Sequence, residues 1–82
     1  MYDIILSDKA KQQLKKLPSE IKNRISTTIE RIKIRPYYFI KRIINSPYFR
    51  LRVGDYRIIL DIKNSELVIL VIGIKNRKNV YK

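Results

Sequence analysis

The chain has 82 residues, 45% of them hydrophobic, and its 19 Lys and Arg outnumber seven Asp and Glu to give a formal net charge of +12. Because it contains no cysteine and no histidine, disulfides, the usual zinc, haem and iron–sulfur ligands, and the Ser-His and Cys-His nucleophile systems are excluded. This length suits one small core, so we predict a single cytoplasmic domain over residues 1–82 that uses no metal or cofactor and binds a polyanion or an acidic protein.

A strand and two helices are predicted in the N-terminal half. The apolar run 2–6 predicts the strand, and Ser7 is expected to cap a helix that ends near Leu17, just before a proline. Ser19 is expected to cap a second helix that ends near Lys33. Isoleucines recur along it at the spacing of one helical face, at positions 21, 25, 29 and 32. The two helices therefore form a hairpin with one apolar side.

The C-terminal half predicts a sheet. Segment 36–47 has no clean period, so we expect a loop that packs its aromatic side chains, Tyr37, Tyr38 and Phe39, onto the fold. From residue 48 the apolar period becomes two, which predicts three consecutive antiparallel strands at 48–53, 56–62 and 66–73. The third is apolar on both faces, so we expect it to be central and covered. The fold class is then α+β: an N-terminal strand, a helical hairpin and a three-stranded meander, with the helices on one face of the sheet.

Membrane insertion is not expected. The longest apolar stretch, 67–72, is far shorter than the roughly 20 residues that a membrane helix needs. The N-terminus also lacks the basic and then apolar pattern of a signal peptide. We therefore predict a soluble protein.

The first two C-terminal strands gather arginines. If Gly54-Asp55 is a two-residue turn of type II′, Arg52 lies opposite Arg57, and Arg50 lies on the same face. Like charges directly across a strand pair destabilise a sheet by some tenths of a kcal/mol, so the arrangement indicates an anion site. Guanidinium groups bind phosphate oxygens in pairs and can stabilise a phosphoryl transition state. The alternative is that these arginines only solubilise one face of the sheet, as part of a solvated basic surface.

Two further features adjoin this face. Continuing the register across a turn at Asn64-Ser65 places Val68, Leu70 and Ile72 on the face of the arginines, as an apolar floor for a base or for a partner's helix. The C-terminal sequence IKNRKNVYK adds more cations and a tyrosine. Tyr81 fits packing against the sheet as well as it fits a functional role. We expect four cations to contact RNA: Lys41, Arg42, Lys75 and Lys78.

Three segments carry a family likeness. The stretches LSDKAKQQLKKLP, YFRLRVGDYRIIL and VIGIKNRKNVY together resemble the RelE/ParE toxin superfamily, and within it the RelE branch. The resemblance implies a toxin of a type II toxin–antitoxin system that enters the ribosomal A site and cleaves mRNA there without a metal. The implied products are a 2′,3′-cyclic phosphate and a 5′-hydroxyl, and the implied partners are the ribosome, mRNA and a RelB-like antitoxin.

The resemblance also assigns catalytic residues. The basic pair before the turn falls on Arg50 and Arg52, and the arginine after it on Arg57. The C-terminal arginine and tyrosine of the family fall on Arg77 and Tyr81. Some members have lysines in place of the basic pair, and many have a histidine or glycine where Lys75 and Asn76 stand here.

The absence of histidine matters for the mechanism. The attacking 2′-hydroxyl must lose a proton and the 5′ oxygen must gain one. Arginine is a poor general base, so Tyr81 is the best candidate, with Lys75 and Lys78 as reserve proton carriers. Two alternatives stay open: a ParE-like gyrase inhibitor on the same fold, and a non-catalytic RNA-binding module in which Tyr81→Phe would change nothing.

Overall fold

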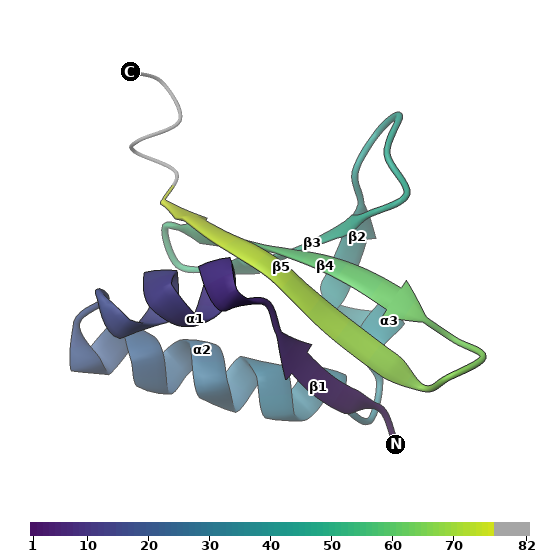
Figure 1. The fold of residues 1–82 in the computed structure, drawn as a ribbon, viewed down its shortest axis with the longest axis horizontal. Helices are drawn as coiled ribbons and strands as arrows, with labels where there is room; N and C mark the ends of the chain where they lie inside the picture. The colour runs from purple at the N-terminus through teal and green to yellow at the C-terminus, as the bar shows by residue number, and fades with distance from the viewer. Residues whose placement is uncertain (77–82) are drawn as a thin grey trace.

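In the computed structural model, which describes residues 1–76, two helices pack against one face of a five-stranded sheet (Figure 1). The helices are α1 (Asp8–Lys15), α2 (Ser19–Ile32) and the single turn α3 (Pro36–Phe39). In sheet order the strands are β1 (Asp3–Leu6), β5 (Val68–Asn76), β4 (Tyr56–Lys63), β3 (Phe49–Val53) and β2 (Ile40–Arg42). The predicted α+β class is confirmed. β1 runs parallel to β5, and every other neighbouring pair is antiparallel.

The predicted cap of α1 is confirmed, and that of α2 is wrong by one residue. The Ser7 hydroxyl accepts from the Ala10 amide at 3.0 Å and donates to the Ile72 carbonyl at 2.7 Å, so it starts α1 and ties it to β5. Ser19 is the first residue of α2 rather than its cap. Pro18 takes the cap position because its extended backbone turns its carbonyl toward the Lys22 amide, at 3.0 Å.

The predicted loop at 36–47 is wrong for its first half, which forms α3 and β2. Ile40 is 8% exposed and lies opposite Leu51, so β2 is a true edge strand of the sheet. A strand of three residues is too short to reveal alternation in a sequence. The expected packing of the aromatics is also wrong, because Tyr37, Tyr38 and Phe39 stay 51%, 78% and 39% exposed.

The core lies between the helices and the inward side of the sheet. The isoleucines of α2 at 25, 29 and 32 are buried, as their spacing predicted. They face alternate residues of the three long strands, which are Leu51, Val53, Ile58, Leu60, Ile69, Val71 and Ile74. Within residues 1–76, no helix is long and apolar enough to span a membrane.

A bulge in β5 determines which side chains at the end of this strand face the core. Ile59 lies opposite Gly73, but Leu60 lies opposite Val71, so Ile72 is an extra residue on β5. The alternation therefore resets, and Ile74 instead of Lys75 turns into the core. β5 is an interior strand, as predicted, but within residues 1–76 helices cover only one of its faces.

Candidate functional site

The predicted register of the β3–β4 hairpin is confirmed. Arg52 lies directly opposite Arg57, and Arg50 lies opposite Ile59. Gly54 has φ +58°, the left-handed value that the first central position of a type II′ turn requires. A turn of two residues fixes which residues face each other. All three arginines therefore point to the face of the sheet that the helices leave open.

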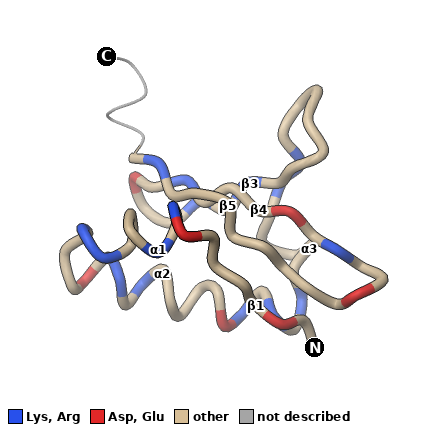
Figure 2. Tube along the Cα trace, viewed as in Figure 1, with Lys and Arg blue, Asp and Glu red and all other residues tan. Residues whose placement is uncertain are grey.

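Two lysines from the neighbouring strands join them. Lys41 on β2 lies opposite Arg50, and Lys75 on β5 lies opposite Arg57, on the face to which the bulge turns it. We call these five side chains, Lys41, Arg50, Arg52, Arg57 and Lys75, the basic cluster. Figure 2 shows Lys and Arg positions gathered at the end of the sheet where β5 stops. Four adjacent strands thus contribute cations to one surface.

Four members of the basic cluster, all but Lys75, line two adjoining hollows. One of about 120 Å³ is lined by Phe39, Lys41 and the three hairpin arginines. A wider one of about 310 Å³ shares Lys41, Arg50 and Arg57 and extends over apolar side chains of β4 and of the β2–β3 loop, which are Ile43, Ile44 and Ile59. Their shared lining makes them one basic depression with an apolar side.

Arg42, predicted to contact RNA, is placed differently from Lys41. Its register partner is Phe49, which packs against the core on the helix side of the sheet. The Arg42 guanidinium lies 5.7 Å from the centre of the Phe49 ring, a cation–π contact. Arg42 still lines the wider hollow, so it borders the basic cluster without belonging to its face.

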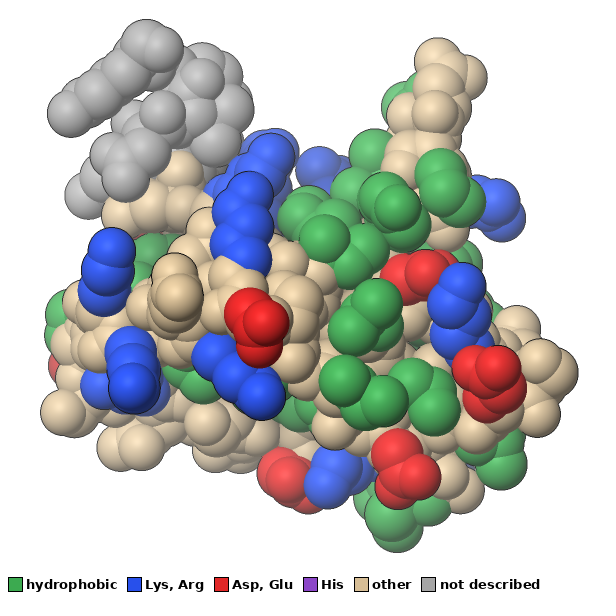
Figure 3. Space-filling view, viewed as in Figure 1, with side chains coloured by type: hydrophobic (Ala, Val, Ile, Leu, Met, Phe, Trp, Pro, Cys, Tyr) green, Lys and Arg blue, Asp and Glu red, His purple; other side chains and the backbone are tan. Residues whose placement is uncertain are grey.

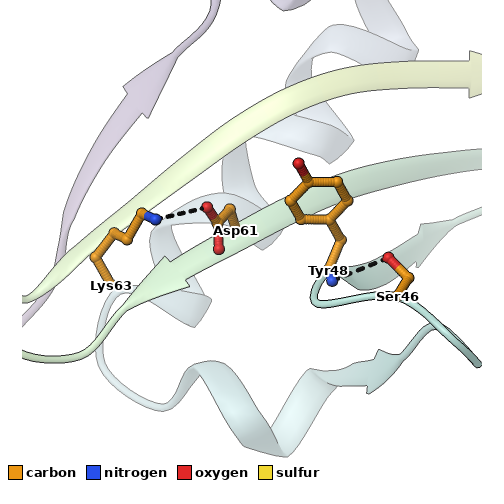
Figure 4. Close-up of polar contacts among 4 residues, drawn as sticks. All are labelled: Ser46, Tyr48, Asp61 and Lys63. Atoms are coloured by element: carbon orange, nitrogen blue, oxygen red, sulfur yellow. Dashed lines mark hydrogen bonds and ion pairs between the residues drawn. The ribbon is translucent and has the colours of Figure 1, made fainter.

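The positive charge of the cluster is not neutralised within the described part of the chain. Among residues 1–76, none of the five cations forms an ion pair. Asp61 shares the face of Arg57, but its carboxylate lies 3.0 Å from the Lys63 ammonium, further along β4 (Figure 4). The hydrogen bond with this carboxylate and its charge raise the pKa of Lys63. The carboxylate of Asp61 therefore pairs with a cation outside the basic cluster. Figure 4 also shows Tyr48 nearby, whose backbone amide donates to the Ser46 hydroxyl at 3.1 Å.

The predicted apolar side chains share the face of the arginines, but the expected two-residue turn at Asn64-Ser65 is wrong, since the turn spans residues 64–67. They therefore lie further along the sheet, with Val68 opposite Lys63 and Leu70 opposite Asp61. Val68, Leu70 and Ile72 are half-buried on the open face of β5, and Ile5 of β1, 49% exposed, lies opposite Leu70. Figure 3 shows hydrophobic side chains on this face next to Lys and Arg. One surface thus offers both cations and apolar side chains.

Sequence reasoning missed a second basic groove, between α2 and the hairpin turn. It encloses about 420 Å³, and its arginines are Arg24, Arg31 and Arg52. Nη1 of Arg24 lies 3.3 Å from the point that a Cβ on Gly54 would occupy. Arg24 and Arg31 are seven residues apart on a helix, so helical spacing could have placed both on one face.

The cluster can bind anions but offers no proton acceptor. Charged lysine and arginine side chains only donate hydrogen bonds. They can hold phosphate groups and stabilise added negative charge, and a general base must come from another residue. The predicted site residues Arg77, Lys78 and Tyr81 lie outside the described residues, so their distances to the cluster stay a prediction.

Comparisons with known proteins agree on one group. The family model described as "ParE toxin of type II toxin-antitoxin system, parDE" matches residues 4–81. No curated protein matches the chain. A chain of the RelBE2 toxin–antitoxin complex from Mycobacterium tuberculosis aligns with TM-score 0.82 and 22% identity, over 93% of this chain and 98% of that one.

Two other solved structures are similar. A chain of the RelB-RelE antitoxin–toxin complex from Methanococcus jannaschii aligns with TM-score 0.76 and 26% identity, over 95% of each chain. The isolated RelE toxin from E. coli aligns with TM-score 0.79 and 17% identity, over 99% of this chain and 92% of that one. At these identities the structures show a shared fold.

Proposed function

Because the chain belongs to the ParE toxin family of type II toxin–antitoxin systems, within the RelE/ParE superfamily, we propose that it is an endoribonuclease that cleaves mRNA in the ribosomal A site. The observation that carries the proposal is the basic cluster, in which five cations of four adjacent strands share one open face. A structural surface gains nothing from like charges placed directly opposite each other. A bound phosphodiester chain would make this arrangement favourable, because guanidinium groups bind its oxygens in pairs.

We assign the phosphate contacts from the position of each cation. Arg57 lies centrally, between Arg52 and Lys75, and would hold the scissile phosphate together with Arg77. Arg50 and Arg52 would bind the neighbouring phosphates. In the pentacoordinate transition state the phosphoryl oxygens gain charge, so these contacts strengthen as the reaction proceeds.

The proton transfers need other groups. The RNA 2′-oxygen attacks phosphorus and gives its proton to Tyr81, whose phenolate nearby cations would stabilise. The bond from phosphorus to the 5′ oxygen breaks, and that oxygen takes a proton from Lys75, Lys78 or a water held by an arginine. An ammonium releases a proton more readily than a guanidinium does. Tyr81→Phe should then abolish cleavage while leaving RNA binding unchanged.

Ribosomes programmed with a defined mRNA test this proposal. Primer extension after addition of the toxin should map a cut in the A-site codon, and a single 2′-deoxynucleotide on the 5′ side of the cut should prevent it, since the nucleophile is gone. Growth arrest in cells whose translated mRNA stays intact would contradict the proposal.

The name of the matching family supports a second candidate, inhibition of DNA gyrase. The match extends over residues 4–81 and is described as a ParE toxin. This activity would need no nuclease centre. Gyrase-linked DNA breaks after expression of the toxin, with mRNA intact, would favour it over the RNA-cleaving function.

A RelB-like antitoxin is the proposed partner. The M. tuberculosis and M. jannaschii structures are complexes of toxin with antitoxin. A chain of net charge +12 favours an acidic helical partner that covers its cations. An adjacent reading frame that encodes a small acidic protein, and that restores growth when expressed with the toxin, would identify it.

A further inference from the structure

Phe39 stands apart from the other phenylalanine of the chain. The ring of Phe49 packs against the core, meets Tyr37 edge-on at 5.7 Å between ring centres, and has the Arg42 guanidinium above it. Phe39, 39% exposed, is not among the side chains of residues 1–76 that pack against the core. Its ring contact is with Tyr38, edge-on at 5.1 Å, and Tyr38 is itself 78% exposed. The fold therefore makes little use of the Phe39 ring.

The hollow that Phe39 lines is otherwise lined by basic side chains. It ends α3 directly before β2 and lines the hollow of about 120 Å³ together with Lys41, Arg50, Arg52 and Arg57. No cation of residues 1–76 lies over its ring, in contrast to that of Phe49. Within residues 1–76 these cations form no ion pair. An exposed aromatic ring next to cations is the combination by which proteins bind single-stranded nucleic acid, with phosphates on the cations and bases on the ring.

We propose that Phe39 is a nucleobase-stacking subsite, in which a base of the RNA strand bound by the basic cluster stacks on the Phe39 ring. This inference rests on the proposed RNA-cleaving function. Because Tyr38 and Phe39 meet at 71° rather than face to face, Tyr38 occupies at most one face of the Phe39 ring. Stacking accepts every base, because each has a flat aromatic face, so the subsite positions the strand without reading its sequence.

Binding of short 2′-O-methyl RNA strands tests the subsite without cleavage, since the attacking hydroxyl is blocked. One strand carries bases, and a second has the same number of phosphates but an abasic site at each internal position. The wild type should bind the base-bearing strand at least about fivefold more tightly, the lower end of the effect of one stacked base. Phe39→Leu should remove this preference and leave affinity for the abasic strand unchanged, while Phe39→Trp should retain it.

A matched control and the contrary outcomes complete the test. Ile34→Ala removes another exposed apolar side chain, 66% exposed, and should leave both affinities unchanged. Equal affinity of the wild type for the two strands, or an unchanged preference in Phe39→Leu, overturns the stacking subsite and leaves the phosphate contacts standing. Failure of the wild type to bind either strand overturns RNA recognition by the basic cluster, and with it the stacking subsite.

Discussion

Arg57 differs from the other members of the basic cluster because it lies directly opposite a cation on both neighbouring strands. It lies opposite Arg52 on one side and Lys75 on the other, and it is half-buried while the other four cations are exposed. A partly desolvated charge is screened less by water and salt than an exposed one. Replacing Arg57 should therefore lower the rate of cleavage more than replacing any other cation of the basic cluster.

Replacing Arg57 tests this ranking. Arg57→Ala should lower the rate of A-site mRNA cleavage by about 100-fold or more, the usual effect of removing one preorganised donor from a charged transition state. Arg57→Lys keeps the charge but loses the paired contacts of a guanidinium, so its rate should lie in between. Single-turnover cleavage on programmed ribosomes measures both. Lys11→Ala, which removes an exposed charge of α1, is the control, and an equal loss there would contradict the ranking.

The backbone at Gly54 is a second feature that depends on one residue. Its φ of +58° is strained for an L-residue, and an added Cβ would meet the Arg24 guanidinium at 3.3 Å. Gly54→Ala should therefore lower the free energy of unfolding by roughly 1–3 kcal/mol, as measured by chemical denaturation. A synthetic chain with D-alanine at 54 should lose little, because a D-residue prefers positive φ. Equal losses for the two forms would rule out backbone strain as the cause.

At the level of elements, the hairpin of β3 and β4 was readable from sequence because its turn is short. Gly54-Asp55 leaves one register, and that register places Arg52 opposite Arg57 as observed. The helical spacing of Ile25, Ile29 and Ile32 was equally informative, because one face of an amphipathic helix repeats regularly.

The elements that could not be predicted from the sequence depend on contacts between residues that are distant in the sequence. β2 has only three residues, and its pairing with β3 is what makes it a strand. The bulge at Ile72 is set by the fit of β5 against β4, yet it decides that Lys75 joins the basic cluster. The exposure of Phe39 is likewise a property of packing, since aromatic residues in an irregular segment are usually buried.

Beyond the end of β1, α1 covers the free edge of β5. β1 pairs with β5 only as far as Val71, and Oε1 of Gln13 accepts from the Ile74 amide at 2.7 Å. This single side chain thus replaces a strand neighbour next to Lys75. It also lies 3.4 Å from the point that a Cβ on Gly73 would occupy, so glycine gives it room.

Removing the Gln13 amide should loosen this end of β5. Gln13→Ala leaves the Ile74 amide without its acceptor, which should cost about 1–3 kcal/mol of stability. Faster hydrogen exchange of the Ile74 amide would locate the loss. Gln12→Ala, an exposed neighbour on the same helix, is the matched control and should change neither stability nor exchange. Unchanged exchange at Ile74 in Gln13→Ala would show that the edge is held by other contacts.

For the whole molecule, two sources of affinity for RNA must be separated: the net charge of +12 and the direct phosphate contacts of the basic cluster. Net charge acts over a Debye length of about 10 Å at 0.1 M salt and weakens with every added ion. Direct phosphate contacts act differently, because each releases bound counterions from the RNA. The salt dependence of binding separates the two.

Two double variants with the same net charge make this comparison. For single strands, the slope of log affinity against log salt concentration is about 0.7 per phosphate contact, so Arg50→Gln with Arg52→Gln should lower its magnitude by about 1.4. Lys9→Gln with Lys11→Gln removes two exposed charges near the start of α1 and should leave the slope near the wild-type value. Fluorescence anisotropy of a labelled strand between 50 and 200 mM salt gives all three slopes. Equal changes in the two variants would mean that total charge, rather than the arrangement of the basic cluster, governs RNA binding.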